Sequence, residues 1–96
     1  MKLPALLAAL AMGLALAAPA EAACYADYKA KQDRPLRLHY GVAEVPDNAC
    51  DRGSASQVLA QRLDRAGWTL LNVLSTFGPE GLEERKASAG EYFLRY

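Results

Sequence analysis

The chain has 96 residues, of which 52% are hydrophobic and 23% charged, and its 11 basic side chains balance 11 acidic ones. A chain of this length suits one small domain. The even charge balance and the absence of a basic tract argue against nucleic acid and anionic membrane surfaces as partners.

The first 22 residues have the pattern of a secretory signal peptide. Lys2 precedes an apolar run over residues 3–18, and Ala-Glu-Ala at residues 20–22 fits an A-x-A cleavage site. The run is too short and too rich in alanine for a good membrane span, so we expect no stable membrane insertion of the mature chain. The sequence therefore predicts a periplasmic or secreted protein, cleaved near Ala22.

Lipid anchoring at Cys24 is the alternative to soluble export. Cleavage directly before Cys24 would leave a cysteine that can carry a lipid. Lipoprotein signals place a leucine three residues before that cysteine, and here Glu21 stands in its place. We therefore expect soluble export.

Two cysteines, Cys24 and Cys50, are the only ones in the chain. Because an exported chain meets an oxidising compartment, we predict that they form an intramolecular disulfide. A domain this small has a marginal core and gains from such a cross-link. The C-x-x-C spacing of redox pairs is absent, so the predicted disulfide is structural.

The first predicted elements are a short tether and a strand. Residues 24–35 are polar and suit a single helical turn tied down by Cys24. Residues 36–45 alternate between apolar and polar side chains, which predicts a strand with one buried face and with His39 on the polar face. The predicted buried face consists of Leu36, Leu38, Tyr40 and Val42. Residues 46–53 are dense in turn formers.

A helix is predicted over residues 55–66. Ser54 is the predicted N-cap, and Gln57 three residues later completes a capping box. Apolar side chains follow at helical spacing, namely Val58, Leu59, Leu63 and Ala66. Gly67 is expected to stop the helix in the left-handed conformation, and Trp68 is expected to pack back onto Leu63.

The remaining elements predict an α+β domain over residues 36–96. Residues 68–77 form a strand that is apolar on both faces and needs cover on both. Residues 78–90 are expected to be a long loop, and residues 91–96 a last strand. We predict a small three-stranded sheet in β-α-β-β order, with parallel outer strands, the last strand between them and the helix on one face. The tethered segment 23–35 or a second copy of the protein would cover the other face.

No catalytic or metal-binding constellation is visible in the sequence. His39 is the only histidine, and no serine lies in a recognisable nucleophile context. A zinc site needs three or four nitrogen or sulfur ligands, and with both cysteines oxidised too few remain. We therefore expect a protein that is not an enzyme and that uses no metal and no cofactor.

The predicted loop 78–90 is the candidate partner-binding segment. Hairpin loops usually have about two to five residues, and one this long is uncommon without a role. Its charged side chains would read a polar partner around an apolar anchor. These side chains are Glu80, Leu82, Glu83, Glu84, Arg85 and Lys86. The alternative is a solvated charged loop with no partner.

Three short motifs carry a family resemblance. They are a helix end LDRAGW, an apolar strand TLLNV and a terminal strand YFLRY. With Leu63, Gly67, Trp68 and Arg95 in the matching places, residues 36–96 resemble the small bacterial domain-of-unknown-function family 4177. The resemblance implies a strand-helix-strand-strand fold and brings no activity with it.

Two functions fit these observations. The first is a non-catalytic interaction or accessory module, stabilised by the disulfide, that binds an unknown protein or a second copy of itself through residues 78–90 or the uncovered face of the sheet. The second is a small-ligand-binding domain or inhibitor, with a pocket between the sheet and the tethered segment near Tyr25 or Tyr28.

Overall fold

The computed structural model describes residues 23–96, and the predicted signal peptide lies outside the described residues. The elements follow in the order β1 (Cys24–Gln32), β2 (Arg37–Val45), η1 (Asp47–Ala49), α2 (Arg52–Arg65), β3 (Thr69–Phe77), η2 (Pro79–Gly81), α3 (Glu83–Ala89) and η3 (Gly90–Tyr92). The α+β class and the three-stranded sheet are confirmed. In the described part of the chain, no helix is long and apolar enough to cross a membrane.

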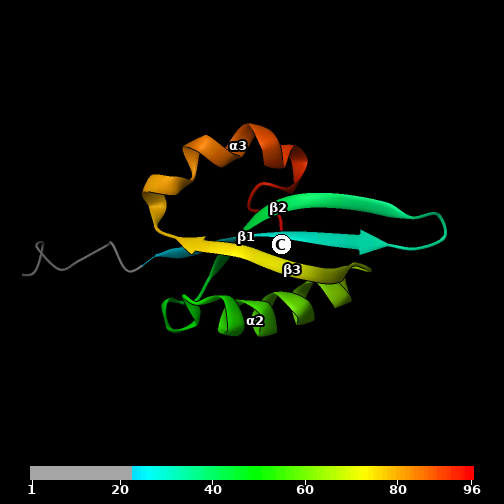
Figure 1. The fold of residues 1–96 in the computed structure, drawn as a ribbon, viewed down its shortest axis with the longest axis horizontal. Helices are drawn as coiled ribbons and strands as arrows, with labels where there is room; N and C mark the ends of the chain where they lie inside the picture. Colours follow the sequence, from blue (N-terminus) through cyan, green and yellow to red (C-terminus); the bar gives the residue numbers. More distant parts are fainter. Residues whose placement is uncertain (1–22) are drawn as a thin grey trace, which may run out of the picture.

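The central strand of the sheet is β1. It pairs antiparallel with β2 on one side and with β3 on the other, so the two outer strands run parallel to each other. Helix α2 makes the crossover between them on one face (Figure 1). The prediction of parallel outer strands around an inserted strand is confirmed, but the inserted strand is β1 and not residues 91–96.

Residues 24–35 are therefore not a helical turn, and residues 23–35 are not a separate tether. Residues 24–32 alternate between small or aromatic side chains and polar ones, which is the period of a half-buried strand. Cys24, Ala26, Tyr28 and Ala30 are all buried. The domain thus begins with β1.

The last residues of the chain do not form a strand of the sheet. Residues 90–92 form η3, and Phe93 makes a single parallel bridge with Val42 of β2. The Leu94 amide donates a hydrogen bond to the Val42 carbonyl at 2.7 Å. Because β1 already fills the centre of the sheet, this segment contacts the outer edge of β2 instead of lying between the outer strands.

Residues 78–90 are not a loop either. They form η2 and α3, and Figure 1 shows α3 on the face of the sheet opposite α2. Pro79 at the start of η2, Glu83 and Glu84 in the first turn of α3 and Lys86 in its last turn suit a helical segment. This segment covers part of the second face of the sheet, which the apolar pattern of residues 68–77 required to be covered, whereas Leu38 and Leu71 stay exposed.

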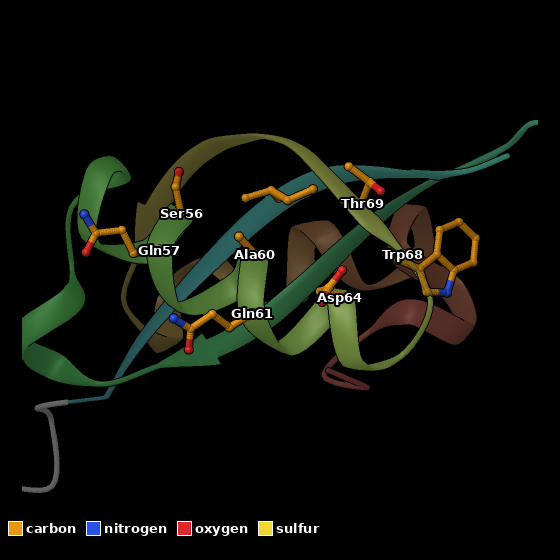
Figure 2. Close-up of a pocket in the computed structure, with 8 residues that line it drawn as sticks. Ser56, Gln57, Ala60, Gln61, Asp64, Trp68 and Thr69 are labelled. Carbon is orange, nitrogen blue, oxygen red and sulfur yellow. The ribbon is translucent and has the colours of Figure 1, made fainter.

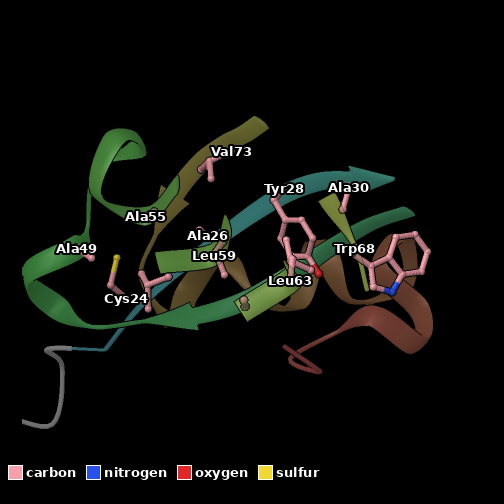
Figure 3. Packing of buried hydrophobic residues seen from close by; sticks show 12 residues of the cluster. Cys24, Ala26, Tyr28, Ala30, Ala49, Ala55, Leu59, Leu63, Trp68 and Val73 are labelled. Atoms are coloured by element: carbon pink, nitrogen blue, oxygen red, sulfur yellow. The ribbon is translucent and has the colours of Figure 1, made fainter. Parts of the chain in front are cut away.

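At the Arg37 end of β2, the face that lies in the core is opposite to the predicted one, whereas Val42 of the predicted face is fully buried. Leu36 and Leu38 are 64% and 66% exposed, whereas His39 is 8% exposed. The reason is the pairing with β1, which places Tyr28 opposite Gly41. A Cβ at Gly41 would lie 2.5 Å from the Tyr28 hydroxyl, so only glycine leaves room for this ring. Figure 3 shows Tyr28 packed between the strands and α2.

Helix α2 begins three residues earlier than predicted. Its N-cap is Asp51, whose carboxylate accepts a hydrogen bond of 2.8 Å from the Ser54 amide. Ser54 is therefore inside the first turn, and the predicted capping box with Gln57 is wrong. Aspartate and serine are both good N-caps, so Asp51 and Ser54 were both possible starts of the helix.

The end of α2 follows the prediction. Gly67 has φ +85°, the Gly67 amide donates to the Asp64 carbonyl at 3.1 Å, and the Trp68 amide donates to the Leu63 carbonyl at 2.8 Å. These two bonds form a Schellman motif. Trp68 is 5% exposed and belongs to the same buried cluster as Leu63, in agreement with the predicted packing of Trp68 against the helix end.

The predicted disulfide between Cys24 and Cys50 is also present, with a Cα–Cα distance of 5.9 Å. It joins the first residue of the central strand to the segment that leads into α2. In the chain-entropy model, closing a loop of this length stabilises the folded state by about 3 kcal/mol. The disulfide thus strengthens the contact between the sheet and the helix.

We predict that Trp68→Ala lowers the free energy of unfolding by about 3 kcal/mol, because it removes a large buried side chain from the core. Urea denaturation of the oxidised protein measures this loss. The matched control is Leu36→Ala, an exposed position whose truncation should change stability by less than about 0.5 kcal/mol. A loss below about 1 kcal/mol for Trp68→Ala would contradict the packing role.

Candidate interaction surface

A buried carboxylate lies beneath α3. Asp27 of β1 is 6% exposed and accepts three side-chain hydrogen bonds. Its donors are the Ser75 hydroxyl at 2.7 Å, the Tyr40 hydroxyl at 2.9 Å and Arg85 Nε at 3.1 Å. The site joins all three strands to α3, because β1, β2, β3 and α3 each supply one of its groups.

The charge of Asp27 is stabilised by these partners. Burial by itself raises the pKa of the Asp27 carboxyl, but the hydrogen bonds from Ser75, Tyr40 and Arg85 outweigh it, and the pKa lies below the usual 3.8. Burial and the bond to Asp27 raise the pKa of Tyr40 to about 12. The group is therefore an ionised carboxylate with neutral hydroxyl donors at neutral pH.

Arg85 is thus an internal anchor of the segment predicted to bind a partner. Besides Asp27, its guanidinium contacts the Gly81 carbonyl at 2.7 Å and lies 4.0 Å from the centre of the Phe77 ring. Leu82 is half-buried. The other predicted partner-binding residues of the segment are exposed, namely Glu80, Glu83, Glu84 and Lys86. These exposed residues share the solvent-facing side of η2 and α3.

His39 lies in an aromatic cluster on the other face of the sheet. Its ring stacks on Tyr92 with 3.8 Å between ring centres and meets Trp68 edge-on at 4.2 Å. His39 Nε2 is hydrogen-bonded to the Tyr28 hydroxyl at 2.9 Å, and Nδ1 is buried with no hydrogen-bond partner. The expectation of a half-exposed histidine is wrong, because the cluster of η3 and Trp68 closes over this end of β2.

The protonation state of His39 follows from this burial. Burial lowers the pKa of the His39 imidazole, the positive charge of Arg95 lowers it further, and Glu91 partly opposes them. The neutral ring is therefore the form that packs against Tyr92. Because Tyr92 belongs to η3, the neutral form of His39 helps to keep the C-terminal segment on β2.

The two edges of the sheet differ. The outer edge of β2 is covered at Val42, which pairs with Phe93 and Leu94, and the Glu44 carbonyl accepts a hydrogen bond from Arg62. In the described part of the chain, β1 is the only strand that pairs with β3, and no loop backbone bonds to the outer edge of β3. The sheet therefore has one partly covered edge and one open edge.

The open strand lacks most of the features that protect edges from pairing. Proteins usually protect an edge with charged side chains, proline, bulges or a short strand. Strand β3 has nine residues, TLLNVLSTF, with no charge and no proline, although the ladder to β1 shifts register at two points. Thr69, Leu71 and Asn72 are exposed, and Leu71 is 49% exposed. The strand offers an uncharged backbone edge to solvent.

A groove runs beside this edge, between α2 and β3. It has a volume of about 560 Å³. Its walls come from the outward side of α2 and from the first residues of β3, and Figure 2 shows these side chains around it. The lining residues are Ser56, Gln57, Ala60, Gln61, Asp64, Trp68, Thr69 and Leu70. An extended segment paired with β3 would place alternate side chains over this groove.

Residues 24–32 are themselves the central strand, so no separate segment packs on the sheet to form the predicted ligand pocket, although Tyr25 lines a cavity of about 450 Å³ together with Arg62 and Tyr96. Within residues 23–96, no group of three or more His, Cys, Asp or Glu side chains is arranged to hold a metal ion. No protein-family model, no curated protein and no solved structure matches the chain. The resemblance to family 4177 stays a prediction, and function has to be inferred from geometry.

The sequence did not point to the open edge of β3 as a binding surface. Its signal was available, since residues 69–77 lack charge in a chain that is 23% charged. That signal had no meaning until the sheet order was known, because a central strand is commonly uncharged as well.

We predict that Arg85→Met lowers the free energy of unfolding by about 2 kcal/mol, since it leaves the Asp27 carboxylate buried with two donors instead of three. The loss should shrink at acid pH, where Asp27 becomes protonated and no longer needs the cation. Chemical denaturation at neutral and at acid pH measures both effects. Glu84→Gln is the control, because Glu84 is an exposed ion-pair partner of the same arginine, and equal losses for the two variants would contradict the anchor.

We predict that stability falls as the pH drops below about 6.5, the ordinary pKa of histidine. The neutral form of His39 contributes fully above that pH, and its contribution is lost as the pH falls towards the lower pKa of the folded state. The unfolding free energy should fall by up to about 1.4 kcal/mol per pH unit in this range. Denaturation curves between about pH 7 and about pH 5 test it, and His39→Gln should abolish the slope. The same slope in His39→Gln would assign the effect elsewhere.

Proposed function

We propose that the protein is a non-catalytic, exported interaction module that binds an extended, uncharged segment of a protein along β3. Main-chain hydrogen bonds to the free edge would supply affinity, and the groove between α2 and β3 would select side chains. The observation that carries the proposal is that β3 is a nine-residue, uncharged edge strand beside an open groove, while the other edge is blocked at Val42 by Phe93.

The interior of the protein supports a rigid platform for such binding. The Asp27 group fixes α3 to all three strands, and the disulfide fixes β1 to the start of α2. A preorganised edge loses little conformational freedom on binding, and this favours affinity. The disulfide also suits an oxidising compartment, in agreement with the predicted signal peptide.

The arrangement of the reactive side chains supports a non-catalytic role. The hydrogen bond of His39 goes to Tyr28, and Ser75 donates to Asp27 beneath α3, so the histidine and this serine belong to different faces of the sheet. A nucleophile needs a base within hydrogen-bond reach. Relative to the expectation from the sequence, the proposed surface moves from residues 78–90 to β3, because Arg85 is used inside the fold.

Selection of random linear peptides on the purified, oxidised mature protein tests this function. We expect uncharged, extended peptides with micromolar affinity, measured by isothermal titration. Leu71→Lys should weaken their binding at least about tenfold, because it places a charge on the pairing edge. The matched control is Leu38→Lys, which makes the same change at an exposed leucine of β2. At concentrations where the protein is a monomer, failure to select any peptide, or equal binding by both variants, would overturn the proposal.

A further inference from the structure

We infer that the segment which pairs with β3 is the β3 strand of a second copy, giving a two-fold symmetric dimer with one continuous six-stranded antiparallel sheet. This inference rests on the proposed function and names the partner of the same edge. Two-fold dimers use the same patch on both subunits, so the patch has to complement itself.

The charge pattern of β3 meets that requirement. In an antiparallel pair about a two-fold axis, residues of the strand face residues of the identical strand, and like charges near the axis repel each other. Strand β3 has no charged residue, whereas β1 contains Asp27, Lys29 and Lys31, and β2 contains Arg37 and Glu44. Strand β3 can therefore pair with a copy of itself in any register without bringing like charges together.

The groove side of α2 is also compatible with a copy of itself. An axis perpendicular to the sheet brings the two α2 helices to the same face in antiparallel directions. Of the α2 residues that line the groove, Asp64 alone is charged, and it lies at the C-terminal end of the row that begins at Ser56. Antiparallel helices therefore place Asp64 of one copy near the serine end of the other, away from the second Asp64. Ala60, midway along the row, leaves room for approach near the axis.

The exposed apolar surface of β3 gives the dimer a driving force. Leu71 is 49% exposed beside the free edge, and Leu70 is half-buried at the floor of the groove. A paired strand would remove both from water, at roughly 25 cal/mol per Å² of apolar area. The edge of β2 is a poorer site for a second copy, because Phe93 and Leu94 occupy it at Val42 and interrupt a continuous ladder.

Sedimentation equilibrium of the oxidised mature protein, from micromolar to millimolar concentration, tests the dimer. We expect a monomer–dimer equilibrium that Leu71→Lys and Asn72→Lys each weaken at least about tenfold, since both charges lie on the pairing strand. Leu38→Lys is the matched control and should leave the dimer unchanged. Circular dichroism checks that each variant is folded, as expected for substitutions at exposed positions.

Hydrogen exchange of the β3 amides gives a second measurement. In the dimer, protection of β3 should rise with protein concentration, while protection of β2 should not. A dimer weakened equally by Leu38→Lys and Leu71→Lys would place the contact on the face of the sheet and overturn the inference. A monomer at every concentration that still binds selected peptides along β3 would overturn the dimer alone, and a monomer that binds no peptide would overturn the proposed function as well.

Discussion

The position of β1 between two antiparallel partners is the constraint on which the rest of the structure depends. One set of alternate residues of β1, which includes Cys24 and Tyr28, faces α2, and the other set, which includes Asp27, faces α3. The disulfide, the Tyr28–His39 hydrogen bond and the Asp27 group all start from this strand. A nine-residue strand thus organises the packing of both helices, which suits a domain too small for a large apolar core.

The end of α2 could be predicted from the sequence, whereas the place of β1 in the sheet could not. The Gly67–Trp68 helix end is local, because one glycine in the left-handed region and one apolar residue after it determine the motif. The role of β1 is not local. Its buried face is largely alanine, which gives a weak apolar signal, and the spacing of Tyr25 and Tyr28 is equally typical of a helical turn.

The candidate surface was harder to predict for the same reason. Asp27 and Arg85 are 58 residues apart, and no local pattern shows that one arginine in a charged segment turns inward while its neighbours stay in solvent. The uncharged composition of β3 is visible in the sequence. Its meaning comes from the sheet order, because the same nine residues would be unremarkable as a central strand and are unusual as an edge.

The coverage of the β2 edge by Phe93 and Leu94 limits the stoichiometry of any assembly built on strand pairing. A sheet with two free edges can add subunits on both sides and grow without end, as fibrils do. When two sheets that each have one free edge pair through these edges, no free edge remains for a third subunit. By blocking the β2 edge at Val42, Phe93 and Leu94 disfavour growth of the sheet on that side, so that strand addition at the uncharged β3 edge does not lead to open-ended aggregation.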